Sequence, residues 1–574
     1  MPKSLKLPPS VIYIVILVAL AGTLVYINTF HADWVWDDVS SVLLHKHVQT
    51  PSSVFQLFLE DQHAFGRGQG NFYRPLVSLS FLIDYQLAGG STPIEGQSSF
   101  VPQISPFVFH LTNLAWHLAA ALCLLGLLAA LNAPYFVLLA VPLIYVLHPL
   151  HTEAVAYISG RADMMSATGI FGALWSSVCY LKSAGRRRYL FFMILCFTGA
   201  LLSKESSLIF PFLLTLLLLT THREPLSESL SDSSKKHCKL HLFSASFIIL
   251  LVYILLRSTV LRFATESSTA SAAFSERAFE TFQSLGIYLK LLFAPFHLHM
   301  ERTLTHAGSL HFLAGCLFFV ALLGAIACSF AKKQSFIGIG ALWFLISWMP
   351  ISGLFPLNAP MAEHWMYVPM AGFWLCLAAI LKPIVSHPQA KFLLYGILGL
   401  FCLFLGTLTI QRNTDWSDNE RLFLATLREN PESARVHYNL AVTYSNLVGN
   451  DAAAKRHYEI FLNLRSKERA QHPDKAGLII DDEIDARLAL GKSLMNLSAY
   501  TEALGIYTPL IALAEFEVWR PTAALAALRS GLCMLALGEI AQSNAYFQQA
   551  MTLEPLYAPD VERIIRGENS FHIY

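Results

Sequence analysis

Charged side chains that could carry out chemistry recur just after long apolar runs of the sequence. An acidic pair, Asp37 and Asp38, follows the first run. Four cations stand in comparable positions further along: Arg74, Arg161, Lys204 and Arg302. A carboxylate can take a proton from an incoming hydroxyl, and cations can stabilise the charge that a phosphate leaving group gains. This combination suits group transfer from a phosphate whose lipid tail remains in a bilayer.

Further polar residues in the same loops are candidates for this site. They are His148, His151, Glu153, Asp163, Glu205, Glu363 and His364. The spacing of His148, His151 and Glu153 can hold a divalent metal, but histidines at helix ends more often bond backbone carbonyls. An acidic pair can also be only a solvated end of a span, and Lys204-Glu205 only a tight turn. Because several loops supply both acids and cations, we favour a functional site.

The composition indicates two kinds of surroundings for these residues. Of 574 residues, 55% are apolar and 14% charged, whereas a soluble chain carries about 25% charged residues. Residues 411–574 alone hold 16 basic and 21 acidic residues. We therefore expect an all-α membrane domain over 1–410 and a water-soluble domain over 411–574. The net charge of +1 disfavours sequence-independent binding of nucleic acid.

A helix crosses the hydrocarbon core with about 20 apolar residues. The sequence predicts about eleven spans, near 10–30, 105–131, 134–148, 163–181, 189–203, 206–221, 241–257, 310–330, 335–350, 364–381 and 391–410. Lys and Arg are concentrated in the loops that share a side with the N-terminus, which predicts a cytoplasmic N-terminus. An odd number of spans then places the candidate site and the C-terminal domain outside. Cysteines lie mostly in apolar runs, so neither a disulfide framework nor a cysteine-based zinc site is expected.

The C-terminal domain has the pattern of tetratricopeptide helical hairpins. Three units fit, and one of them requires an extra residue between Tyr444 and Gly449. Such arrays bind extended peptides or partner proteins. Four polar residues are candidates to line an acceptor groove, although ordinary solvated helix faces are the commoner explanation: Arg435, Asn439, Lys492 and Asn496.

The order of the motifs resembles the transmembrane, tetratricopeptide-repeat-containing O-mannosyltransferases and their bacterial relatives. The motifs are Trp36-Asp37-Asp38, Tyr73-Arg74-Pro75-Leu76, His148-Pro149-Leu150-His151-Thr152-Glu153, Gly160-Arg161-Ala162-Asp163, Ser203-Lys204-Glu205, Tyr288-Leu289-Lys290 and Glu363-His364-Trp365-Met366-Tyr367-Val368-Pro369. The resemblance covers nearly the whole chain and implies a glycosyltransferase-C fold.

The resemblance implies transfer of a sugar, mannose being favoured, from a polyprenyl or dolichyl phosphate to Ser or Thr hydroxyls of proteins. Asp37 and Asp38 match the family's acidic pair, and Arg161 and Lys204 match its cations. His364 departs from the arginine expected in many relatives. Inversion at the sugar carbon is also implied, which needs a single base. A lipid-linked sugar donor is the cosubstrate expected, with a divalent metal as an open alternative.

Two other functions remain open at this stage. The chain could be a membrane-anchored scaffold whose repeats recruit partner proteins, or a glycosyltransferase acting on lipid or glycan acceptors. Neither a phosphate-binding loop nor a dinucleotide fingerprint occurs in the sequence, which favours a lipid-carried donor. We expect a bacterial inner membrane with periplasmic repeats, or the endoplasmic reticulum lumen in a eukaryote.

Overall fold

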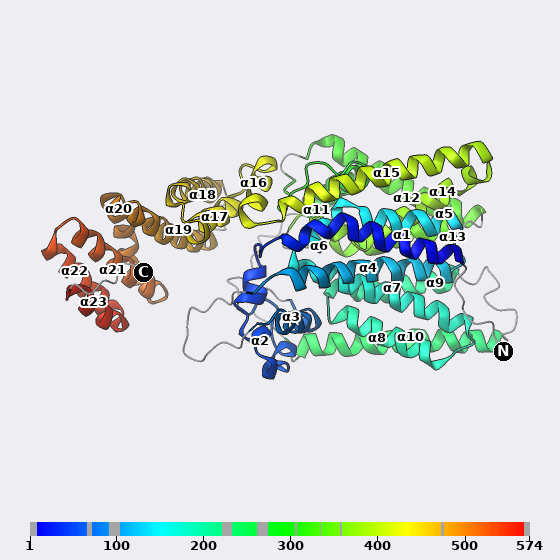
Figure 1. The fold of residues 1–574 in the computed structure, drawn as a ribbon, viewed down its shortest axis with the longest axis horizontal. Coiled ribbons are helices and arrows are strands. Elements are labelled where there is room, and N and C mark those ends of the chain that lie inside the picture. Colours follow the sequence, from blue (N-terminus) through cyan, green and yellow to red (C-terminus); the bar gives the residue numbers. More distant parts are fainter. Residues whose placement is uncertain are drawn as a thin grey trace. The chain divides into compact units, whose positions relative to one another are not determined.

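The chain folds into two compact units, Met1–Leu422 and Phe423–Tyr574, which we call the membrane unit and the repeat unit. A computed structural model describes residues 9–65, 72–90, 104–220, 232–259, 261, 274–304, 307–332, 335–355, 357, 359–471 and 476–566. In these ranges the secondary structure is helical, apart from one isolated bridge between Arg302 and Met361 (Figure 1). The expected all-α class is confirmed.

Each apolar run of the membrane unit forms a helix. The helices are α1 (Pro9–Tyr26), α4 (Phe107–Ala130), α5 (Tyr135–Leu147), α7 (Arg161–Lys182), α8 (Arg187–Leu201), α9 (Phe210–Thr220), α10 (Asp232–Thr259), α12 (Ser309–Lys332), α13 (Ser335–Trp348), α14 (Pro369–Leu381) and α15 (Pro388–Asp415). Their long apolar surfaces make the chain a multi-pass membrane protein.

Fewer helices than the eleven expected are long enough to be full spans. Among the described residues, seven meet the criteria of length and apolarity, or eight if α5 and the bent segment after it form one span. The helices α5, α8, α9 and α13 have 11 to 15 residues. At 1.5 Å per residue they reach about 20 Å, short of the roughly 30 Å hydrocarbon core.

Among the described residues, four further α-helices of the membrane unit lie in segments expected to be loops. They are α2 (Lys46–Gln49), α3 (Pro75–Leu87), α6 (Thr152–Ala156) and α11 (Phe274–Phe293). The helix α11 packs so closely on α12 that a Cβ atom on Gly286 would collide with the backbone of His311. The site is therefore enclosed by more regular structure than the sequence predicted.

The helices α1 and α15 run side by side toward the same end of the membrane unit (Figure 1). The Asn413 amide donates to the Val25 carbonyl at 2.8 Å, and the Asp33 N–H donates to the Ser417 carbonyl at 2.8 Å. Trp416 is fully buried here. These contacts explain why the membrane unit ends at Leu422, twelve residues beyond the boundary expected at 410.

Three helical hairpins build the repeat unit, as the pattern predicts. They pair α17 (Ala434–Thr443) with α18 (Asp451–Gln471), α19 (Ala476–Asn496) with α20 (Tyr500–Ile511), and α21 (Arg520–Ala536) with α22 (Ile540–Leu553). The extra residue of the first hairpin lies in a π-helix, Tyr444–Val448, which ends at Gly449 with a φ of +70°. Small residues are needed between the helices, since a Cβ on Gly531 would lie 2.5 Å from the Phe547 ring.

The orientation in the membrane stays a prediction. Some of the basic residues on which it depends, Lys3, Lys6, Arg223 and Lys333, lie outside the described residues.

Candidate active site

The Asp38 carboxylate is wholly buried and is held by backbone groups. Its Oδ1 accepts the N–H of Ser159 at 2.8 Å, and its Oδ2 accepts the N–H of Val35 at 3.2 Å. Burial raises the pKa of Asp38 to about 7, against the opposing effect of these hydrogen bonds. Asp38 thus ties the loop after α1 to the segment that precedes α7.

Asp37 has different surroundings from its neighbour. Its side chain is half-buried, and Trp36, the residue before it, has a φ of +50°. A non-glycine residue in this left-handed region is uncommon and often marks a functional position. The Trp36 ring stacks on Tyr157 with ring centroids 5.7 Å apart. The pKa of Tyr157 is raised by burial and by the two aspartates, and its hydroxyl interacts with Asp37.

Arg161 lies near the acidic pair, and protein groups already occupy its guanidinium. Its guanidinium is fully buried, with Nη1 2.6 Å from Asp84 Oδ2 and Nε 2.6 Å from Asn113 Oδ1. The Asn113 amide in turn donates to carbonyls of the turn before α7, including that of Tyr157 at 3.1 Å. In this structure the donors of Arg161 are occupied by α3 and α4, and through Asn113 it organises the turn that holds the acidic pair. Its expected role as a phosphate ligand stays a prediction.

Two other expected cations lie together and are partly exposed. Arg74 Nε is 3.2 Å from Glu205 Oε2, and Lys204 Nζ is 2.6 Å from Asp163 Oδ1. Their side chains are 14% and 12% exposed. The backbone joins the two positions, because the N–H of Leu76 donates to the Leu202 carbonyl at 3.2 Å.

Asp163 pairs Lys204 with α7, the helix that begins directly after the turn that holds Asp38. It lies in the first turn of α7, four residues after the Ser159 N–H that binds Asp38. We call Asp37, Asp38, Arg74, Lys204, Asp163 and Glu205 the acidic-pair cluster. His63 is also near, and burial lowers its pKa to about 4, with a further contribution from Arg74.

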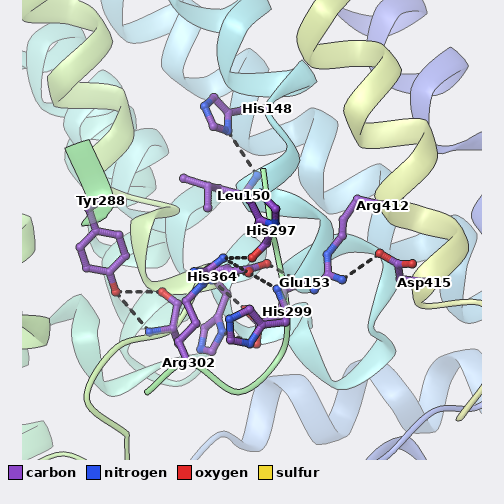
Figure 2. Close-up of polar contacts among 12 residues, drawn as sticks. His148, Leu150, Glu153, Tyr288, His297, His299, Arg302, His364, Arg412 and Asp415 are labelled. Atoms are coloured by element: carbon purple, nitrogen blue, oxygen red, sulfur yellow. Dashed lines mark hydrogen bonds and ion pairs between the residues drawn. The ribbon is translucent and has the colours of Figure 1, made fainter. Parts of the chain in front are cut away.

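A second polar cluster is centred on two buried glutamates, Glu153 and Glu363. Figure 2 labels Glu153 with Arg302, His364 and Arg412 around it. Glu363 Oε1 accepts from Arg302 at 2.9 Å, and its Oε2 lies 3.4 Å from Arg412 Nη2. Glu153 binds His364 through an Nδ1–Oε1 contact of 2.9 Å. The Arg302 side chain is 9% exposed and pairs with Glu363, which makes it part of this glutamate cluster. Its expected role as a donor-phosphate ligand stays a prediction.

The loop between α11 and α12 is fastened to the glutamate cluster. The His299 N–H donates to Glu363 Oε1 at 2.6 Å, and burial lowers the pKa of the His299 ring to about 3. The Tyr288 hydroxyl donates to the Ala362 carbonyl at 2.9 Å (Figure 2).

The two histidines of the possible metal motif form hydrogen bonds with backbone carbonyls. His148 Nε2 lies 3.1 Å from the Leu292 carbonyl, and His151 Nδ1 lies 2.8 Å from the Tyr145 carbonyl (Figure 2 shows His148). Glu153 points to His364 rather than to either ring. Within the described ranges, no group of three or more His, Cys, Asp or Glu side chains could hold a metal ion. The metal alternative for this motif stays an untested prediction, with both histidines hydrogen-bonded to backbone carbonyls in this structure.

The candidates converge on one end of the membrane unit but form two adjoining clusters. The segment between α6 and α7 separates them, with Glu153 in one cluster and Asp163 in the other. An aromatic contact links them, because Trp416 packs on Tyr157 at 5.4 Å and also faces the Arg412 guanidinium at 5.7 Å.

Several residues of these clusters escaped the sequence analysis. They are Asp84, Asn113, Tyr157, Ser159, Arg412 and Trp416. Asn113 and Asp84 carry a usable signal, since each is a polar residue within an apolar helical stretch. The others have ordinary sequence surroundings.

The four expected groove residues lie in the repeat unit. Arg435 and Asn439 are on α17, and Lys492 and Asn496 are on α19. Asn496 donates to Asp451 Oδ2 at 3.0 Å. Their role in acceptor binding stays a prediction.

The fold and site define a class: a multi-pass α-helical membrane protein with charged clusters at one end of its helices and a unit of helical hairpins. No model of a known protein family matches the chain. Several curated proteins, however, are similar to it in sequence. Protein O-mannosyl-transferase TMTC4 of Mus musculus is 24% identical over 498 residues, covering 77% of this chain and 65% of that protein.

Two further relatives give the same result. Protein O-mannosyl-transferase TMTC3 of Homo sapiens is 23% identical, covering 84% of this chain and 53% of that protein. The relative F38B6.6 of Caenorhabditis elegans, also named a protein O-mannosyl-transferase, is 24% identical over 72% of this chain and 57% of its own length. The chain is a relative of the TMTC family, as the motif order predicts. It spans about half to two thirds of the length of these relatives.

Proposed function

We propose that the chain is a membrane glycosyltransferase of the TMTC type, which transfers mannose from a polyprenyl or dolichyl phosphate to Ser or Thr hydroxyls of proteins. The names of its relatives support the reaction class. The observation that carries the proposal is the half-buried Asp37, placed at the same end of the membrane unit as two partly exposed cations.

Asp37 is the residue of the pair that suits general-base chemistry. A base must reach the proton it abstracts, and both oxygens of Asp38 are already occupied by backbone N–H groups in a buried position. In the proposed step, the acceptor oxygen attacks the anomeric carbon while its proton passes to Asp37. The bond from that carbon to the phosphate oxygen breaks, and the polyprenyl phosphate leaves.

Arg74 and Lys204 are the groups proposed to bind the donor phosphate. Each is now paired with a carboxylate and still partly exposed, so a phosphate can compete for its hydrogen bonds. Cations held in place by such partners stabilise charge as it develops on the leaving group. The glutamate cluster is proposed to keep the loop before α12 in place beside the site.

The repeat unit is proposed to recruit the protein acceptor, since arrays of this kind bind extended peptides. An extracytoplasmic location of the site and repeats, in a bacterial inner membrane or in the endoplasmic reticulum, is part of the same proposal.

A transfer assay tests the function. Full-length protein in lipid nanodiscs is incubated with radiolabelled polyprenyl-phosphate mannose and extracytoplasmic proteins. Label in protein that β-elimination releases as a Ser- or Thr-linked sugar supports the proposal. Label only in lipid or glycan supports the alternative acceptor, and no transfer at all supports the scaffold.

A further inference from the structure

Three buried polar atoms in segments next to Arg74 have no hydrogen-bond partner among the described residues. They are Gln62 Nε2, Glu205 Oε1 and the Tyr253 hydroxyl oxygen. Gln62 is 2% exposed and Tyr253 is 7% exposed. A buried polar group without a partner costs stability unless a ligand or water supplies the missing hydrogen bond. The three atoms therefore indicate a ligand with several hydrogen-bonding groups.

Arg74 holds two of these side chains. Its Nη1 donates to Gln62 Oε1 at 3.5 Å, and its Nε donates to Glu205 Oε2 at 3.2 Å. The loop that carries Gln62 is fastened here, because the Gln62 N–H donates to the Phe72 carbonyl at 3.0 Å. Each side chain thus gives one terminal atom to the guanidinium, and its other terminal atom is the one without a partner.

The helix α10 brings the third atom to the same region. The Arg257 guanidinium carbon lies 5.7 Å from the centroid of the Tyr73 ring, and Tyr73 directly precedes Arg74. Tyr253 precedes Arg257 by four residues, so both lie on one face of α10. This face points inward at Tyr253, because both chain neighbours of Tyr253 are about half exposed while Tyr253 is buried. Figure 1 shows α10 beside α8, whose C-terminal end leads to Glu205.

The three atoms differ in the hydrogen bonds they can form. A carboxylate only accepts hydrogen bonds, an amide nitrogen only donates, and a phenol hydroxyl does both. A phosphate oxygen would be repelled by Glu205 Oε1, whereas a sugar hydroxyl can donate to it and a second can accept from Gln62 Nε2. This combination of acceptor and donor fits a polyhydroxylated ligand.

We propose that Gln62, Glu205 and Tyr253 bind hydroxyl groups of the sugar on the donor lipid, while Arg74 and Lys204 bind its phosphate. The inference rests on the proposed function and adds the residues that recognise the sugar.

Direct binding of two lipids to the full-length protein in nanodiscs tests the inference. One lipid is polyprenyl-phosphate mannose, and the other is polyprenyl methyl phosphate, a phosphate diester of the same charge without the sugar. The measured quantity is the ratio of their affinities, which a purely structural role of these residues would not change. We expect the wild type to favour the mannosyl lipid.

Two variants remove single hydrogen-bonding atoms. Tyr253→Phe removes the hydroxyl and keeps the ring, and its loss of one hydrogen bond should lower the ratio about 2- to 10-fold. Glu205→Gln replaces one carboxylate oxygen and should lower the ratio about 10-fold, because hydrogen bonds to charged groups are stronger. The control is Tyr395→Phe on α15, whose ring packs on Phe136 and which should keep the wild-type ratio.

Unchanged ratios in Tyr253→Phe and Glu205→Gln would overturn the inference, as would a wild type that binds the two lipids equally. Neither result depends on transfer, so both leave the proposed reaction standing. A wild type that prefers the mannosyl lipid but transfers no mannose would instead remove the proposed function, and the lowered ratios of the variants would still support a sugar site.

Discussion

Two neighbouring aspartates, Asp37 and Asp38, have opposite surroundings. Asp38 accepts two backbone N–H groups out of contact with water, whereas Asp37 is half-buried and interacts with the Tyr157 hydroxyl. A sequence shows both as equal members of an acidic pair. Only the packing of the turn before α7 separates a structural carboxyl group from the proposed base.

The raised pKa of Asp38 predicts a pH-dependent stability. The folded pKa of about 7 exceeds the ordinary value of 3.8, so between these values the folded protein holds a proton that the unfolded chain releases. The contribution of Asp38 to the free energy of unfolding is therefore fully present below about pH 4, and it is lost as the pH rises to about 7. In nanodiscs, Asp38→Asn should flatten the fall of the unfolding midpoint between pH 4.5 and 7.5, values chosen to bracket this range. Equal slopes for the two proteins would contradict the assignment.

At the level of elements, the turn between α6 and α7 supports both clusters. It supplies the Ser159 N–H to Asp38 and the Tyr157 ring to the aromatic stack, and α7 begins directly after it at Arg161. Arg161 donates a hydrogen bond to Asn113, whose amide donates in turn to the Tyr157 carbonyl of this turn. The geometry of the acidic pair should consequently depend on this turn.

Gly160→Ala tests that dependence. The new Cβ would lie 2.7 Å from the Glu153 carbonyl and 2.8 Å from the Ala154 carbonyl, so backbone atoms must move. Forced overpacking of this kind costs about 1–3 kcal/mol. We expect a lower unfolding midpoint and a clear loss of transfer activity. Gly324→Ala on α12 is the matched control, since nothing lies within 4 Å of its new Cβ. Equal behaviour of the two variants would show that the turn is not a determinant of the site.

The sequence predicts the helices better than the side-chain contacts between them. Apolar runs are enough to place the helices of the membrane unit. The residue inserted after Tyr444 lies in the π-helix Tyr444–Val448. The convergence of the loops on one end follows from their positions along the chain. Charge alone, however, does not reveal burial: the sequence predicts Arg161 and Arg302 as cations of the site but not their ion pairs with Asp84 and Glu363. Such pairs join residues distant in sequence and depend on tertiary packing.

At the scale of the whole molecule, the proposal requires the repeats and the acidic-pair cluster to face the extracytoplasmic side. The repeat unit offers a direct test, because Asn496-Leu497-Ser498 matches the acceptor pattern for N-glycosylation and Asn496 is exposed. In a eukaryotic host, we expect an endoglycosidase-sensitive glycan that Asn496→Gln removes. The repeats should also resist protease in sealed membrane vesicles until detergent is added. An unglycosylated chain whose repeats are digested in sealed vesicles would contradict this orientation.

The most direct test of the account is the rate of mannosyl transfer by Asp37→Asn at saturating donor. General-base catalysis contributes about 10²- to 10⁴-fold, so we expect a loss of that size while the affinity for polyprenyl-phosphate mannose stays at the wild-type value. Transfer by Asp37→Asn at the wild-type rate would contradict the claim that Asp37 takes the acceptor's proton.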